Sequence, residues 1–210
     1  MIRKKILNAS LRLTLVMGSQ DTGKRSMREI AEAAFEGGAT ALQLREKALP
    51  DGELYREALD LADLCRSRSK LFIVNNRLDV AMAVGADGVH LGADDVPVAA
   101  AARIVPKRMI IGYSAADQES ARKAVLDGAD YLGVGALYPS PSKPECPVVA
   151  PEDIASILSL RQPTVGIGGI TVQNSNLAWA HGFNGLALIS ALCSAPDPAE
   201  AARKILSGCV

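Results

Sequence analysis

The stretch LFIVNNRLDVAMAVGADGVHLGADD, residues 71–95, decides the fold. It begins with a short apolar run at 71–75 and continues with an amphipathic segment at 78–84. It then returns through Gly85-Ala86-Asp87 to a second apolar run at 88–91. A strand, a helix, a glycine suited to a left-handed helix cap and a second strand make a βαβ unit. Such a unit joins two parallel strands by a right-handed crossover.

The same unit repeats along the whole chain. Glycine turns precede strands again at 37–39, 128–130 and 182–184. Apolar runs predict strands at 11–17, 41–45, 71–75, 88–91, 109–114, 131–135, 164–168 and 185–190. Helical patterns follow them at 26–36, 52–67, 78–84, 98–104, 118–126, 151–160, 173–180 and 198–206.

Eight strands that alternate with eight helices predict an α/β fold, a single (β/α)8 TIM barrel. We expect one domain over residues 1–210, in which residues 1–10 form an N-terminal extension. An open doubly wound sheet is the alternative, but it would usually contain fewer strands and a switch-point crevice.

Composition and charge exclude several classes of function. Hydrophobic residues make up 49% of the chain and aromatic residues only 4%, so the core must be built from small and aliphatic side chains. The 23 basic residues balance the 23 acidic ones, which leaves no electrostatic footprint for nucleic acid or an anionic membrane. No apolar run approaches the roughly 18 residues that span a bilayer. The four scattered cysteines indicate reduced thiols rather than a zinc site or disulfides. We therefore expect a cytoplasmic protein.

The second predicted strand ends in a motif suited to a diphosphate. In a (β/α)8 barrel the functional residues follow the C-terminal ends of the strands. The segment QLREK occupies residues 43–47, and the alternation of side chains along a strand points Gln43, Arg45 and Lys47 toward the barrel mouth. One amide and two cations there could grip a diphosphate. The alternative is a solvated loop with an ion pair between Arg45 and Glu46.

The third and fourth strands end in residues suited to a hard cation. Asn75 and Asn76 close the third strand, and Asp94 and Asp95 follow the fourth. Carboxylates beside amide oxygens suit Mg²⁺, which also keeps waters and binds substrate phosphate. The alternative for the two aspartates is capping of the next helix. His90 alternates inward on its strand, where a packed wall residue is more common than a substrate contact.

The remaining strand ends carry groups suited to phosphate. Ser114 closes the fifth strand, and the segment SPSK at 140–143, stiffened by prolines, offers two hydroxyls and an ammonium as a second phosphate clamp. An ordinary surface turn is the alternative there. The seventh and eighth strands end in GIGGIT at 166–171 and ISA at 189–191, where glycine lets a phosphate approach backbone N–H groups.

Taken together, these segments resemble the thiamine-phosphate synthase family from about residue 11 to residue 206. The matching segments are QLREK at 43–47, VNNRLDVAMAVGADGVHLGADDVP at 74–97, IGYS at 111–114, ADYLGVGALYPSPSK at 129–143, GIGGI at 166–170 and ALIS at 187–190. The resemblance implies a transferase that joins hydroxymethylpyrimidine diphosphate and a thiazole phosphate to give thiamine phosphate and diphosphate. It also implies Mg²⁺ as a cofactor and, by analogy, a homodimer.

The resemblance further implies a role for each matching residue. The pyrimidine diphosphate would be held by Gln43, Arg45, Lys47, Asn75, Ser114 and Lys143, among which Arg45, Ser114 and Lys143 form the catalytic set. The thiazole phosphate would be held by Ser140, Ser142, Gly169, Ile189 and Ser190. Asp95 and Asn76 would hold Mg²⁺, and Asn76 stands where the family usually has an aspartate.

Three alternatives stay open. A thiazole tautomerase-like enzyme shares the barrel, but that branch is associated with a histidine two residues after the serine of the fifth strand, where this chain has Ala116. A homologue that binds thiazole phosphate without turnover would follow if Asn76 impaired the metal site. A sugar-phosphate isomerase would need an acid–base pair at the strand ends, for which Glu46 and Lys47 are the obvious candidates.

Overall fold

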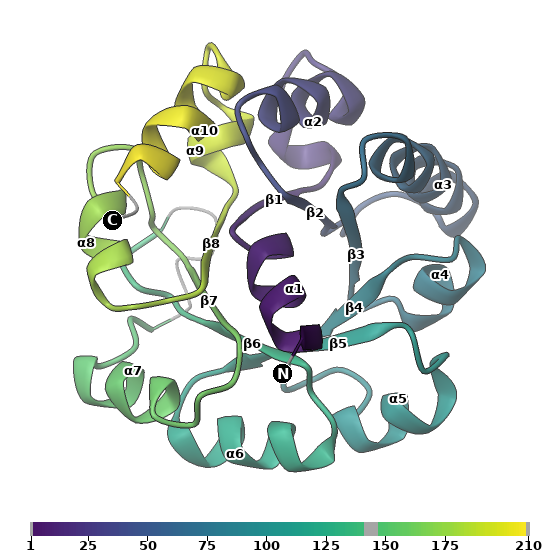
Figure 1. The fold of residues 1–210 in the computed structure, drawn as a ribbon. Helices are drawn as coiled ribbons and strands as arrows, with labels where there is room; N and C mark the ends of the chain where they lie inside the picture. Colours follow the sequence, from purple (N-terminus) through teal and green to yellow (C-terminus); the bar gives the residue numbers. More distant parts are fainter. Residues whose placement is uncertain (1, 141–146, 209–210) are drawn as a thin grey trace.

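Eight parallel strands close into a barrel in the computed structural model, which describes residues 2–140 and 147–208 (Figure 1). The strands are β1 (Leu13–Met17), β2 (Ala41–Leu44), β3 (Leu71–Asn75), β4 (Gly88–Leu91), β5 (Ile110–Ala115), β6 (Tyr131–Val134), β7 (Thr164–Ile167) and β8 (Gly185–Leu188). Their spatial order follows the sequence, and β1 pairs with β8 to close the barrel. The expected (β/α)8 barrel is confirmed, and every predicted strand lies within about two residues of an observed one.

A ring of helices covers the outside of the barrel (Figure 1). Those that follow the strands are α2 (Met27–Glu36), α3 (Asp51–Ser67), α4 (Leu78–Ala83), α5 (Val98–Ile104), α6 (Gln118–Asp127), α7 (Pro151–Leu158), α8 (Ser175–Ala180) and α10 (Pro198–Ser207). Three further elements lay outside the predicted set: α1 (Ile2–Ser10), the 3₁₀ helix η1 (Ser19–Asp21) and α9 (Ser190–Cys193).

Helix α1 covers the end of the barrel at which the strands begin. Residues 1–10 were expected as an extension, but α1 packs against the barrel and lies over its centre in Figure 1. Leu7 and Leu11 are buried in the same apolar cluster as Val16 and Tyr131, whose side chains fill the barrel interior. This arrangement leaves the opposite end of the barrel, at the C-terminal ends of the strands, for a ligand.

The strands bury both of their faces. Along β6, Leu132 and Val134 belong to the large apolar cluster that includes the core-facing sides of the helices, whereas Tyr131 faces the barrel interior. This alternation follows from the two-residue period of a strand. Burial on both faces explains why the strands read as short, nearly continuous apolar runs in the sequence.

The glycine turns at the N-terminal end of the barrel repeat one pattern of contacts. Gly38, Gly85, Gly128 and Gly182 have φ values of 103°, 67°, 111° and 90°, the left-handed backbone that was predicted for them. Two residues after each glycine, a polar side chain accepts a hydrogen bond from the backbone N–H near the start of the preceding strand. The donor and acceptor pairs are Leu13–Thr40, Phe72–Asp87, Ile111–Asp130 and Thr164–Asn184, at 2.9–3.0 Å. The repeated turns therefore fix the strands at the end of the barrel that carries no predicted chemistry.

Candidate active site

A cavity of about 150 Å³ opens at the C-terminal ends of the strands. All eight strands or the residues directly after them contribute to its walls. The lining residues are Thr14, Val16, Gln43, Arg45, Asn75, His90, Ser114, Tyr131, Gly133, Gly135, Ala136, Ser140, Val165, Ile167, Gly168, Ala187 and Ile189. Six of the predicted site residues are among them: Gln43, Arg45, Asn75, Ser114, Ser140 and Ile189. The placement of functional residues at the C-terminal ends of the strands thus brings groups from distant parts of the sequence into one cavity.

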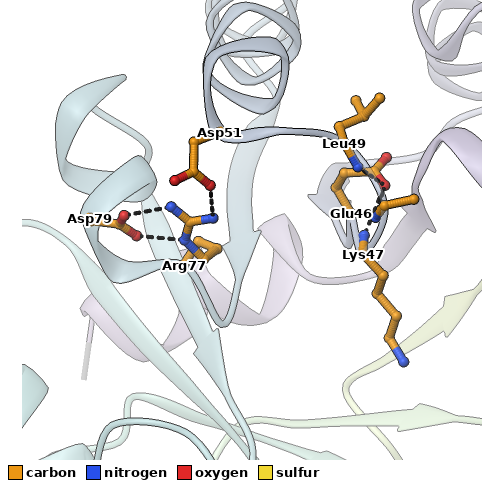
Figure 2. A network of polar contacts seen from close by, with 7 residues as sticks. Glu46, Lys47, Leu49, Asp51, Arg77 and Asp79 are labelled. Carbon is orange, nitrogen blue, oxygen red and sulfur yellow. Dashed lines mark hydrogen bonds and ion pairs between the residues drawn. The ribbon is translucent and has the colours of Figure 1, made fainter.

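Two of the three polar residues predicted at the end of β2 line this cavity. Gln43 is 6% exposed and lines the cavity with Arg45, which follows the last strand residue. Lys47 is exposed and does not line the cavity, because β2 ends at Leu44 and the alternation of side chains does not continue past Arg45. Figure 2 shows the Lys47 side chain extended away from Glu46.

Glu46 shapes the loop that carries these cations. Its Oε1 accepts hydrogen bonds from the backbone N–H groups of Lys47 and Ala48, both at 2.8 Å, and of Leu49 at 3.3 Å (Figure 2). Its Oε2 accepts a hydrogen bond from the backbone N–H of Ser19 at 2.7 Å. Burial alone would raise the pKa of Glu46, but the hydrogen bonds from Ser19, Ala48 and Lys47 lower it below its usual value.

These contacts bear on two alternatives raised by the sequence. The carboxylate of Glu46 bonds backbone amides, and no ion pair joins it to Arg45 among the described residues. Glu46 is also absent from the cavity lining, so it is not placed as the acid–base partner that an isomerase would need. Neither the simple Arg45–Glu46 pair nor the isomerase pair is supported.

Arg77 joins the two loops that follow β2 and β3. Its Nε and Nη2 donate to the two carboxylate oxygens of Asp79 at 2.9 and 2.7 Å, and its Nη1 contacts Asp51 at 2.8 Å (Figure 2). Asp51 is the first residue of α3, directly after the loop that carries Arg45 and Lys47. Hydrogen bonds to Asp79 and then to Asp51 raise the pKa of Arg77 further above its usual value, so the guanidinium stays charged in this contact.

A chain of three polar side chains runs from the barrel interior to the cavity wall. The His90 ring lies 2.9 Å from the Tyr131 hydroxyl through Nδ1 and 2.9 Å from the Ser114 hydroxyl through Nε2. His90 and Tyr131 are 7% and 2% exposed, and burial strongly raises the pKa of Tyr131, so its hydroxyl stays protonated. The predicted substrate-binding residue Ser114 is therefore held by a buried histidine. Sequence reasoning placed His90 inward but left it and Tyr131 out of the site.

Thr14 is a buried polar residue at the cavity that the sequence did not single out. It is 2% exposed, and its Oγ1 has no hydrogen-bond partner among the described residues. Threonine is common in strands, so its presence in β1 carries no signal by itself.

The predicted metal residues lie in the loops after the neighbouring strands β3 and β4. Asn76 has φ of 63° and donates its backbone N–H to the carbonyl of His90 at 2.9 Å. Asp95 accepts a hydrogen bond from the backbone N–H of Gly92 at 2.6 Å, which closes its own turn. Neither Asp94 nor Asp95 caps α5, whose N-cap is Pro97 without a side-chain bond, so the capping alternative is wrong. Within the part of the chain that the structure describes, no cluster of three or more His, Cys, Asp or Glu side chains could hold a metal by itself.

The loops after β6, β7 and β8 form a smaller pocket of about 30 Å³ beside the main cavity. The predicted residues Ser140, Gly169, Ile189 and Ser190 line it, and Ser140 and Ile189 belong to both spaces. Gly169 has φ of 65°, and a Cβ there would come within 2.6 Å of the carbonyl of Pro139. Only glycine therefore lets the loop after β7 pass this close to the loop after β6.

Two predicted site residues, Ser142 and Lys143, lie outside the described residues, which stop at 140 and resume at 147. Their expected roles are not tested. No helix in the described ranges has the length and apolar character needed to cross a membrane.

Comparison with known proteins gives consistent results over nearly the whole chain. A family model described as thiamine monophosphate synthase matches residues 13–192. A thiamine-phosphate synthase of Coprothermobacter proteolyticus is 41% identical over 206 residues, which cover 98% of each chain. A thiamine-phosphate synthase of Methanospirillum hungatei is 46% identical over 178 residues, 84% of this chain and 86% of its own.

Among solved structures, a thiamine phosphate pyrophosphorylase from Pyrococcus furiosus matches with a TM-score of 0.88 at 37% identity. The match covers 96% of both chains.

Proposed function

The chain belongs to the thiamine monophosphate synthase family, and on that premise we propose how it joins hydroxymethylpyrimidine diphosphate to a thiazole phosphate. The enzyme is a transferase whose products are thiamine phosphate and diphosphate. The observation that carries the proposal is one chamber with two adjoining parts. Arg45 and Gln43 line the larger cavity, and the loops after β7 and β8 line the smaller pocket beside it.

The chemistry asks the protein mainly for electrostatic stabilisation. The bond between the pyrimidine methylene carbon and the diphosphate oxygen breaks, and its electron pair leaves with the diphosphate. The lone pair of the thiazole nitrogen forms the new bond to the methylene carbon, and that nitrogen becomes positively charged. Cations and hydrogen-bond donors held ready around the leaving group lower the barrier, because they need no reorganisation as negative charge develops.

The two parts of the chamber divide the substrates between them. We assign the pyrimidine diphosphate to Gln43, Arg45, Lys47, Asn75, Ser114 and Lys143, with Arg45, Ser114 and Lys143 closest to the reacting bond. We assign the thiazole phosphate to Ser140, Ser142, Gly169, Ile189 and Ser190. A planar ring in the cavity would lie against the apolar side chains of Val16, Val165 and Ile167, which line it. Loops after the seventh and eighth strands are a common phosphate site in this fold.

His90 adds to this assignment a role that the sequence did not predict. Its Nε2 lies 2.9 Å from the Ser114 hydroxyl, and its other nitrogen lies 2.9 Å from the hydroxyl of Tyr131. Because the Tyr131 hydroxyl is protonated and can donate to Nδ1, the other nitrogen can carry the proton and donate to Ser114. The Ser114 hydroxyl would then be free to donate to a ligand.

The residues present fit Mg²⁺ bound jointly with substrate. Asp95 would supply a carboxylate and Asn76 an amide oxygen, and Mg²⁺ is usually bound by few protein ligands together with phosphate oxygens and waters. When bound, the cation would neutralise charge on the diphosphate. The missing family aspartate at position 76 predicts weak binding of the cation in the absence of the diphosphate.

Release of diphosphate tests the function directly. We expect the purified protein to release diphosphate only when both substrates and Mg²⁺ are present, with thiamine phosphate formed in equal amount. Tight binding of thiazole phosphate without diphosphate release would instead indicate a homologue without turnover. Conversion of a thiazole substrate to an isomer without the pyrimidine diphosphate would indicate the tautomerase alternative.

We place the reaction in the cytoplasm as a further part of the proposal. The two cysteines of the described ranges, Cys65 and Cys193, are both buried and unpaired, which agrees with a reducing compartment. The homodimer expected by analogy stays a prediction.

A further inference from the structure

The loop between β2 and α3 is held in place by contacts at both of its ends. At its start, Glu46 accepts hydrogen bonds from the three backbone N–H groups that follow it, of Lys47, Ala48 and Leu49. At its end, Asp51 contacts Arg77, which extends from the loop after the neighbouring strand β3 (Figure 2). The residues between these anchors include Lys47, whose side chain is exposed.

Glu46 also connects two loops that are far apart in the sequence. Its Oε2 accepts from the backbone N–H of Ser19, in the loop after β1, at 2.7 Å. The backbone of Arg45 is bound to the same region, because its N–H donates to the carbonyl of Met17 at 2.8 Å. One carboxylate therefore satisfies four backbone donors and fixes the backbone on both sides of Arg45 and Lys47.

The position of Glu46 is unfavourable if charge alone is considered. It lies between two cations that the proposed function assigns to a diphosphate, and a carboxylate so close to a bound diphosphate repels it. Its hydrogen bonds explain how a negative charge can be present there. Each oxygen is turned toward backbone N–H groups, and the residue does not line the cavity.

We propose that Glu46 is a positioning residue that holds Arg45 and Lys47 in the geometry required by the diphosphate. This inference rests on the proposed function, because that function gives the two cations their ligand. Glu46 contacts neither substrate. It orders the loop before the diphosphate binds, so the free energy of binding is not reduced by the cost of ordering the loop.

The sign of the effect separates this role from simple electrostatics. Replacement of Glu46 by Ala or Gln removes a negative charge, which should strengthen diphosphate binding if charge alone mattered. Positioning predicts the opposite. The side-chain amide introduced by Glu46→Gln would keep one carbonyl oxygen for the backbone N–H groups of Lys47 and Ala48, but it would turn an NH₂ donor toward the N–H of Ser19. The Glu46→Gln effect should therefore lie between those of wild type and Glu46→Ala.

The test compares Glu46→Ala and Glu46→Gln with Glu53→Gln. Glu53 lies in the first turn of α3, is exposed, and removal of its charge leaves the loop contacts intact. We expect KM for the pyrimidine diphosphate to rise about tenfold to a hundredfold in Glu46→Ala, the range that a displacement of about 1 Å can produce. KM for the thiazole phosphate should change less than about twofold in the same variant, because its pocket lies at the loops after β7 and β8. Glu53→Gln should leave both values unchanged.

A second measurement separates failure of the inference from failure of the proposed function. Binding of inorganic diphosphate is measured by calorimetry for wild type, Lys47→Ala, Glu46→Ala and Glu46→Gln. If wild type shows no turnover, the proposed function is wrong, and the diphosphate affinities alone decide the role of Glu46. Weaker binding in both Glu46 variants supports positioning, whereas unchanged or tighter binding overturns it. An equal rise in both KM values would overturn it too, because it would indicate general disruption of the barrel mouth.

Discussion

Gly112→Ala tests how the barrel makes room for the buried rings beneath the cavity. Gly112 on β5 pairs with His90 on β4 and with Tyr131 on β6. A Cβ at this position would lie 2.5 Å from His90 Nδ1 and closer still to the Tyr131 ring, whereas ordinary contact begins at 3.4 Å. The two side chains are 7% and 2% exposed, and both line the cavity, which offers them space to move into.

Overpacking of this kind costs about 1–3 kcal/mol, and a domain of this size loses about 2–4 °C of Tm per kcal/mol, so we expect Tm to fall by about 2–12 °C. Displaced rings would also disturb Ser114, so KM for the pyrimidine diphosphate should rise. Thermal unfolding followed by circular dichroism, together with steady-state kinetics, measures both effects.

Two other glycines provide a graded comparison. A Cβ at Gly133 would lie 3.0 Å from His90 Cε1, so Gly133→Ala should destabilise less than Gly112→Ala. A Cβ at Gly52, in the first turn of α3, meets nothing within 4 Å, so Gly52→Ala should leave stability equal or higher. A Gly112→Ala protein that unfolds at the wild-type temperature, or later than Gly133→Ala, would refute the packing described for His90 and Tyr131.

Three further predictions follow from single residues. Thr14→Val removes a buried hydroxyl that has no hydrogen-bond partner in the described residues. We expect the free energy of unfolding, measured by urea titration, to rise by about 1 kcal/mol. Equal or lower stability would show that the hydroxyl is hydrogen-bonded. Burial raises the pKa of the Cys65 and Cys193 thiols to about 12. Iodoacetamide at pH 7.5 should therefore label neither thiol in the folded protein and both thiols in urea. Labelling of either thiol in the folded protein would contradict this burial. Asn76→Asp should raise Mg²⁺ affinity or activity; no change in either would remove Asn76 as a reason for weak metal binding.

Most of the fold could be predicted because two kinds of signal agreed. Apolar runs of strand length alternate with amphipathic segments, and a glycine turn precedes every second strand. Helix α1 could not be predicted in this way. Polar residues such as Asn8 and Ser10 interrupt its apolar pattern, and its stability depends on Leu7 and Leu11 entering the end of a barrel formed by the rest of the chain.

The site was predictable where strand geometry decides direction. Gln43, Asn75 and Ser114 line the cavity because a closed barrel turns every second side chain inward at the strand ends. The rule still holds for Arg45, directly after β2, but it fails two residues further on, where Lys47 is exposed outside the cavity. The signal that could have revealed the pair His90 and Tyr131 is Gly112 on β5, the strand between theirs, which leaves volume for both rings.

Loop geometry could not be predicted from sequence. The bonds of Glu46 depend on the backbone path of its own loop and on Ser19 from another loop. At position 76 the structure offers a local reason for asparagine, because φ of 63° is a left-handed backbone that asparagine adopts more readily than most residues. The family pattern suggested only a lost metal ligand there.

In the proposed reaction, Arg45 neutralises the departing diphosphate in one part of the chamber while the thiazole phosphate binds in the other. The most direct test is Arg45→Ala, with KM measured for each substrate at saturating concentrations of the other. We expect KM for the pyrimidine diphosphate to rise about tenfold or more, as loss of a charge-assisted hydrogen bond would give, with little change for the thiazole phosphate. An equal loss for the two substrates, or no loss for the pyrimidine diphosphate, would contradict it.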